Sequence, residues 1–183
     1  MRRFVVAAAV VFAATAIDAK VFLSREEALR LAFPAATIER KTVFLTADQQ
    51  REAQRLSGDG ALPSALVAYY VATKDGREIG TAYFDTHVVR TMSETIMVVV
   101  DPLGNASRVE VLSFLEPEDY LPRPHWYEQF QGKRLDDELS MKRGIRPIAG
   151  ATLTARATID ATRRVLALHQ VIQRSAAKKG ASP

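Results

Sequence analysis

A long amphipathic segment near the C-terminus, preceded by a turn of small residues, does most to limit how this chain can fold. Residues 155–172 carry apolar side chains at helical spacing, so that one face of a helix collects Ala161, Val165, Leu168 and Ile172. The segment before them reads AGATLT, and Gly150 with two alanines permits a narrow turn there. A helix with one apolar face needs another layer to cover that face. The sequence therefore predicts a long helix that begins near Thr154 and packs on a sheet.

The strands of that sheet are predicted upstream, between turn signals. Asp75-Gly76 indicates a tight hairpin, and residues 101–105 indicate a longer turn. Three successive valines, residues 98–100, predict a central strand that is buried on both faces. Because short connections favour antiparallel neighbours, we expect an α+β fold with an antiparallel sheet of four or five strands packed with helices. The candidate strands are Thr37–Leu45, Ala65–Thr73, Glu78–Asp85, Thr95–Val100 and Arg108–Phe114.

Two shorter helices are predicted near the N-terminus. Ser24 and Glu27 form a capping box, and Pro34 helps to end the helix that follows. A second helix starts at Thr46 and runs to about Leu56, before a break rich in glycine and serine. One interpretation is that the two helices form a pair that covers one face of the sheet.

Residues 1–19 have the features of a secretory signal peptide. Arg2 and Arg3 precede an apolar run that ends in the A-x-A site Ala14-Thr15-Ala16, and Ala19 is a second candidate end. The run is short for a permanent membrane span, although an uncleaved anchor is the alternative. We therefore expect a periplasmic or other extracytoplasmic location, with or without attachment to the membrane.

Composition narrows the functional classes. The chain has no cysteine, which excludes disulfides, iron–sulfur clusters, cysteine-ligated zinc and attachment of c-type haem. Its three histidines are not spaced as metal ligands, so a redox role needs an organic cofactor. The net charge of +4 is scattered, and about half of it belongs to Arg2 and Arg3, which argues against a nucleic-acid partner.

The AGATLT turn and the ARATIDATRRVLAL segment after it resemble the S/T-G-A-T motif and helix of the FMN-binding domain family. That family includes periplasmic flavin subunits of Rnf and Nqr electron-transport complexes. Its motif threonine carries FMN through a phosphoester bond that a flavin transferase makes, and the resemblance implies this role for Thr152. It places the phosphate beside Gly150, Ala151, Leu153 and Thr154. The chain departs from the motif at Ala149, where the family has serine or threonine, and at Arg146, where it has aspartate.

Without the resemblance, the same turn has a simpler interpretation. Thr152 or Thr154 could be an N-cap, whose hydroxyl accepts a hydrogen bond from the first helical N–H groups. A helix N-terminus also favours a phosphate, since its N–H groups lack helical partners.

The proline-rich loop Leu115–Pro124 is similar to an E-T-P-G-type loop that lies near the flavin in related subunits. This resemblance implies that Glu116, Tyr120 and Leu121 lie near the ring. A W-x-x-Q-F-x-G-K segment follows, in which Trp126 and Phe130 share one helical face and are typical of core packing. Three cations before the turn could hold a phosphate or simply form a solvated face: Lys142, Arg143 and Arg146.

Together these features predict a signal peptide or anchor over residues 1–19 and an N-terminal segment, residues 20–60, that packs on the domain. An FMN-binding domain over residues 61–174 and a flexible tail over residues 175–183 complete the chain. We expect an exported electron carrier rather than a stand-alone enzyme, with FMN on Thr152. Its partners would be a flavin transferase and a membrane electron-transfer protein. The alternative is a periplasmic binding or assembly module of the same fold that binds FMN non-covalently or not at all.

Overall fold

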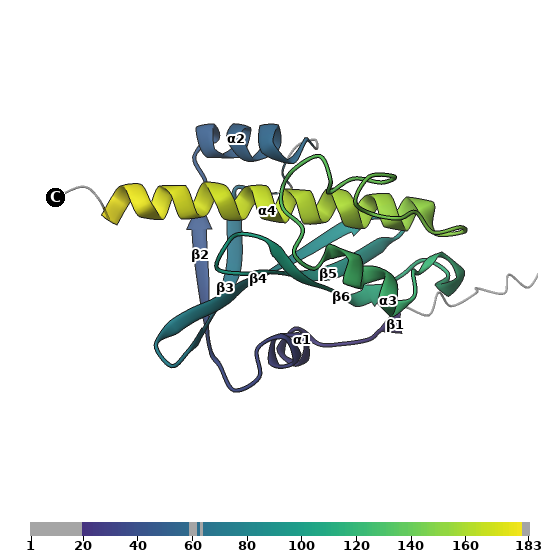
Figure 1. Cartoon of the computed structure of the whole chain (residues 1–183), viewed down its shortest axis with the longest axis horizontal. Helices are drawn as coiled ribbons and strands as arrows, with labels where there is room; N and C mark the ends of the chain where they lie inside the picture. Colours follow the sequence, from purple (N-terminus) through teal and green to yellow (C-terminus); the bar gives the residue numbers. More distant parts are fainter. Residues whose placement is uncertain (1–19, 59–61, 63, 181–183) are drawn as a thin grey trace, which may run out of the picture.

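The computed structural model describes residues 20–58, 62 and 64–180 (Figure 1). The predicted signal peptide and its cleavage sites lie outside these residues. Within them, no helix is long and apolar enough to cross a membrane.

The chain builds one antiparallel sheet whose strand order is β1-β6-β5-β4-β3-β2. The predicted α+β class is confirmed, with five strands of eight or more residues and a two-residue strand, β1, at one edge. Asp75 and Gly76 have φ angles of 51° and 74°, as the predicted tight hairpin requires. The strands are β1 (Lys20–Val21), β2 (Thr37–Phe44), β3 (Leu66–Lys74), β4 (Arg77–Val88), β5 (Ser93–Val100) and β6 (Ala106–Phe114).

Helices cover both faces of the sheet (Figure 1). The first two begin with capping boxes, in which Ser24 pairs with Glu27 and Thr46 with Gln49. The last helix has 29 residues and lies along the sheet, with α2 against it and α1 on the opposite face. The helices are α1 (Arg25–Ala32), α2 (Ala47–Ser57), α3 (Pro124–Tyr127) and α4 (Thr152–Gly180), and short 3-10 turns span Glu118–Tyr120 and Glu128–Phe130.

Strand β5 is the centre of two hydrophobic cores. Ile96 and Val98 belong to the core beneath α4, whereas Met97 and Val99 belong to the core beneath α1. The prediction of a strand buried on both faces is therefore confirmed. The predicted apolar face of α4 is also confirmed, because all four of its residues are buried: Ala161, Val165, Leu168 and Ile172.

A glycine lets α1 approach the sheet. A Cβ atom at Gly80 would lie 3.1 Å from the Phe33 ring and 3.1 Å from the Val100 carbonyl oxygen. Phe33 is 4% exposed and fills this space from the end of α1. A side chain at position 80 would therefore compete with the ring that anchors α1.

Several expectations differ from the structure. The two N-terminal helices do not share a sheet face, because α2 packs on α4 and α1 packs on the other side. Within the N-terminal segment, β2 pairs with β3 along its whole length and so belongs to the sheet. Residues 175–180, expected to fray, continue α4, and that helix begins at Thr152 rather than near Thr154. The proline-rich loop contains one 3-10 turn.

Candidate functional site

The predicted attachment residue, Thr152, is the first residue of α4 and is exposed to solvent. Its hydroxyl donates to the carbonyl oxygen of Ile148 across 3.4 Å, at the upper end of hydrogen-bond distance. Gly150 has a φ of 84°, in the left-handed region that favours glycine, and the nearest atom to a Cβ there would be 4.0 Å away. The turn is thus open on this side, and the Thr152 residue is exposed.

The residues around Thr152 differ in accessibility. Ala151 is buried and Leu153 is 48% exposed, whereas Thr154 is 1% exposed. The Thr154 hydroxyl donates to the carbonyl oxygen of Tyr120 at 2.6 Å. Both threonines lie inside α4 rather than at the residue before it, and their hydroxyls donate to carbonyl groups of earlier residues, so neither is the N-cap.

We expect Thr154→Val to destabilise the protein by about 1–2 kcal/mol, because the Tyr120 carbonyl would lose its buried donor. The volume of the side chain is retained, so the change isolates the hydrogen bond. Urea unfolding followed by the fluorescence of Trp126, the only tryptophan, would measure the difference. Thr154→Ser, which keeps the hydroxyl, is the matched control, and equal losses in both variants would contradict the assignment.

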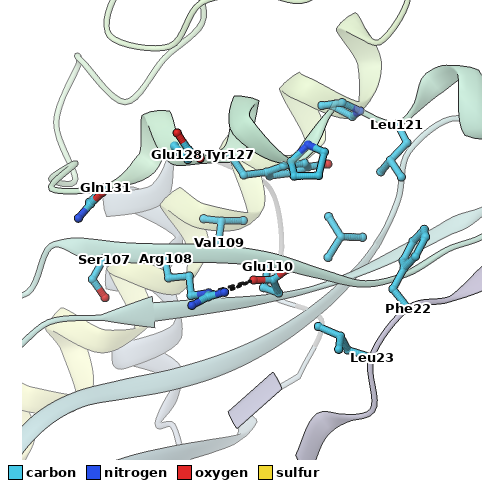
Figure 2. Close-up of a pocket in the computed structure, with 13 residues that line it drawn as sticks. Phe22, Leu23, Ser107, Arg108, Val109, Glu110, Leu121, Tyr127, Glu128 and Gln131 are labelled. Atoms are coloured by element: carbon cyan, nitrogen blue, oxygen red, sulfur yellow. Dashed lines mark hydrogen bonds and ion pairs between the residues drawn. The ribbon is translucent and has the colours of Figure 1, made fainter. Parts of the chain in front are cut away.

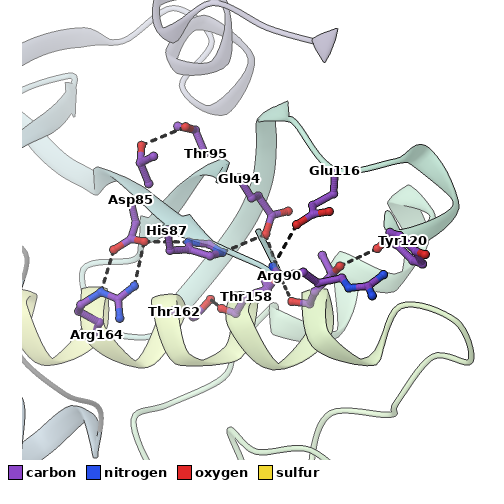
Figure 3. A network of polar contacts seen from close by, with 12 residues as sticks. Asp85, His87, Arg90, Glu94, Thr95, Glu116, Tyr120, Thr158, Thr162 and Arg164 are labelled. Atoms are coloured by element: carbon purple, nitrogen blue, oxygen red, sulfur yellow. Dashed lines mark hydrogen bonds and ion pairs between the residues drawn. The ribbon is translucent and has the colours of Figure 1, made fainter. Parts of the chain in front are cut away.

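The loop that contains Glu116 lies beside this helix end, and the carboxylate is already engaged (Figure 3). Glu116 Oε1 accepts hydrogen bonds from the backbone N–H groups of Arg90, Thr91 and Met92, at 3.1, 2.6 and 2.9 Å. The bond from Thr91, reinforced by the other two, holds the pKa of the Glu116 carboxyl below its usual range. Glu116 therefore fixes the turn between β4 and β5, which is a structural role.

Tyr120 and Leu121 are half-buried and continue this loop. The guanidinium carbon of Arg90 lies 4.5 Å from the centroid of the Tyr120 ring, a cation–π contact. Through Thr154 and Tyr120, the structure brings together three predicted parts of the site: the AGATLT turn, the start of α4 and the loop 116–121. Arg90 also lies in this group of residues, and no motif in the sequence indicated it.

The three cations before the turn lie at the surface of the protein. Lys142, Arg143 and Arg146 are exposed, and Arg143 pairs with Asp137 at 3.0 Å. The backbone of Arg146 is held, because its N–H donates to Gln129 Oε1 and its carbonyl accepts from Trp126 Nε1, both at 2.8 Å. Trp126 is buried, as is Phe130, which confirms the prediction that they pack in the core.

A buried ionic cluster lies between the sheet and α4 (Figure 3). We call it the His87 cluster: Asp85, His87, Glu94 and Arg164. The two ring nitrogens of His87 contact Asp85 Oδ1 at 2.9 Å and Glu94 Oε2 at 3.0 Å. Arg164 of α4 forms a bidentate ion pair with Asp85, with N···O distances of 2.9 and 3.0 Å. The side chains are at most 11% exposed.

The charges of the cluster balance when His87 is protonated. Burial alone would lower the pKa of His87, but hydrogen bonds to Asp85 and Glu94 outweigh burial and raise it to about 9. Burial would raise the pKa of Asp85, but hydrogen bonds from His87 and Arg164 hold it below its usual range. Protonated His87 thus lies between two carboxyl groups, one of which also pairs with Arg164.

This cluster predicts how stability depends on pH. Because the pKa of His87 is about 9 in the folded state and 6.5 in an ordinary environment, its contribution is complete below pH 6.5. The contribution declines as pH rises and is lost above pH 9, a change of about 3 kcal/mol. Urea unfolding at pH 6, 7.5 and 9 should show this decline in the native protein and a flatter profile in His87→Gln. Parallel profiles would contradict it.

The sequence analysis missed this cluster. Asp85 and His87 are two residues apart on β4, so they share a face, and His87 lies directly opposite Glu94 on β5. The register of the hairpin was therefore the signal that could have found the cluster. Glu94 is fully buried, and within the part of the chain that the structure describes neither its Oε1 atom nor the Tyr127 hydroxyl has a hydrogen-bond partner. Such burial gives the cluster a structural role, because it leaves no access for a substrate.

A cavity of about 580 Å³ lies beside β6 and beneath α3 (Figure 2). We call it the β6 cavity. Leu121 contributes to its wall, which connects it to the loop 116–121. In the part of the chain that the structure describes, no group of three or more histidine, aspartate or glutamate residues could hold a metal ion.

No protein-family model, curated protein or solved structure matches this chain.

Proposed function

We propose that this protein is an exported FMN-binding electron carrier, with the flavin attached through its phosphate to Thr152. The observation that supports this most is the position of Thr152: an exposed hydroxyl at the first residue of a 29-residue helix. The resemblance of the AGATLT turn to the motif of the FMN-binding domain family supplies the identity of the ligand.

The residues around Thr152 suit a phosphate. The N–H groups of Thr152 and Leu153, which are both exposed, precede the first helical hydrogen bond, which runs from Ala155 to Ala151, so they are available to an anion. The first turn of α4 contains no acidic residue that would repel it. The open φ-positive turn at Gly150 allows close approach to the backbone.

The neighbouring residues would orient the cofactor. Thr154 holds the loop 116–121 against α4, and Arg90 lies on the Tyr120 ring at the surface of that loop. Bound FMN would supply one- or two-electron redox chemistry, which the side chains of this chain do not. The protein's own task would be to position the ring and to leave it open to an electron donor and an acceptor.

The test is to express the mature protein with and without a flavin transferase. Mass spectrometry should show the added mass of FMN only when the transferase is present, and the loaded protein should absorb visible light. An unmodified mass and a colourless protein would favour the alternative, a binding or assembly module without covalent flavin. Arg146 and Ala149, the two departures from the motif, are exposed and support that alternative.

A further inference from the structure

Within residues 20–58, 62 and 64–180, the outer edge of β6 is paired only at its two ends. At one end Phe114 and Ser113 pair with β1, and the carbonyl oxygen of Leu112 accepts from the N–H groups of Phe22 and Leu23. At the other end Ala106 exchanges hydrogen bonds with Gly132 and Lys133, at 2.7 and 2.8 Å. Among the described residues, no strand pairs with the outer side of residues 107–111.

The β6 cavity lies along this unpaired stretch (Figure 2). All five residues from 107 to 111 contribute to its wall. Because neighbouring side chains on a strand point to opposite faces, a cavity that touches all five must lie at the strand's edge rather than on one face. Phe22 and Leu23 form one end, Gln131 lies at the other, and Tyr127 lies above the strand.

We propose that the β6 cavity binds an extended segment of a partner polypeptide, which adds a short strand to β6. An edge strand presents backbone N–H and C=O groups that only another extended backbone can satisfy in series. The gap of five residues spans about 17 Å, so it accommodates a segment of about four or five residues.

The residues that line the β6 cavity indicate which side chains the bound segment would carry. Val109, Val111 and Tyr127, which belong to or pack against the core beneath α4, give one side of the cavity an apolar surface. On the other side Arg108 and Glu110 neutralise each other in an ion pair at 2.8 Å. The complementary segment alternates apolar residues with small polar ones and carries little net charge.

A second copy of this chain does not fit the edge. Antiparallel pairing of two β6 edges around Val109 would place Leu112 of one copy opposite Ala106 of the other. Both positions already hold segments of their own chain on the outer side, around residues 22–23 and 132–133. The two folded edges would collide, whereas a single flexible segment enters the gap.

The test uses synthetic five-residue peptides that alternate valine, isoleucine, tyrosine or phenylalanine with threonine, added to the isotope-labelled protein up to about 5 mM, in the range of weak single-strand recognition. We expect NMR shift changes that are confined to the amides of residues 107–111 and their neighbours. Peptides of the same sequences with alternate backbone nitrogens methylated should bind at least tenfold more weakly, because they lack the hydrogen-bond donors.

Variants at exposed positions locate the site without disturbing the core. Gln131→Trp should fill one end of the cavity and abolish the shifts, whereas Gln173→Trp, on the exposed face of α4, should leave them unchanged. The proposal is overturned if no peptide of the panel shifts residues 107–111, or if the methylated peptides bind equally well. Displacement of the peptides by riboflavin would overturn it as well, because the cavity would then be a small-molecule site.

Discussion

Replacing His87 with alanine should lower the free energy of unfolding at pH 7 by about 3–5 kcal/mol, the usual cost of breaking a buried ion pair from one side. The imidazolium contacts both carboxylates of the His87 cluster, at 2.9 and 3.0 Å. Without it, one arginine faces two buried anions. Glu94 would lose more than Asp85, because the Thr158 hydroxyl that remains beside it is a distant donor at 3.4 Å, whereas Asp85 keeps its ion pair with Arg164.

A second substitution separates charge from packing. If the loss in His87→Ala comes from the uncompensated carboxylate, adding Glu94→Gln should recover part of the stability, because it removes that charge. His125→Ala is the matched control, since His125 is exposed on α3, and it should change stability by less than about 0.5 kcal/mol. Urea unfolding followed by Trp126 fluorescence measures all three. No recovery in the double variant would show that the cluster acts through packing alone.

Local sequence signals predicted most of the fold because the interactions behind them join residues that are close together in the sequence. The capping box at Ser24, the helix start at Thr46 and the Asp75-Gly76 hairpin depend on residues three positions apart or fewer, and each is present as predicted. The buried face of α4 follows from its 3.6-residue period. The continuation of α4 through residues 175–180 was missed, although α2 packs along the same helix and Gln49 bonds to Ser175 at 2.6 Å.

The site was harder to predict because its contacts join residues far apart in the chain. Thr154 bonds to a carbonyl 34 residues earlier, and Arg164 pairs with an aspartate 79 residues earlier. Glu116 illustrates the difficulty: its position in the loop was anticipated, but its carboxylate binds the backbone of residues 90–92. Composition and spacing cannot show which acceptor a long-range donor finds, because the strand order and register decide that.

Thr152→Ala should abolish covalent flavin loading completely in cells that contain a flavin transferase, whereas Thr37→Ala should load as the native protein does. Both threonines are exposed, and Thr37 lies on β2. The substitution at Thr152 should cost little stability, because the hydrogen bond from its hydroxyl to Ile148 is 3.4 Å long at an exposed site and alanine suits a helix. Intact-mass spectrometry separates loss of attachment from loss of folding, which far-ultraviolet circular dichroism checks independently.

Restoring the family motif at its two departures would distinguish the flavin carrier from the assembly module. If Arg146 and Ala149 limit recognition by the transferase, Arg146→Asp with Ala149→Ser should raise the loaded fraction, and Thr152→Ala on that background should return it to zero. Both side chains are exposed, and the hydrogen bonds of residue 146 use its backbone, so the restored motif should fold normally. A double variant that stays unmodified beside a transferase shown to act on its own substrate would count against a covalent flavin. The exposed threonine at the start of α4 would then be a helix end without a cofactor, and the assembly module would be the better explanation of the fold.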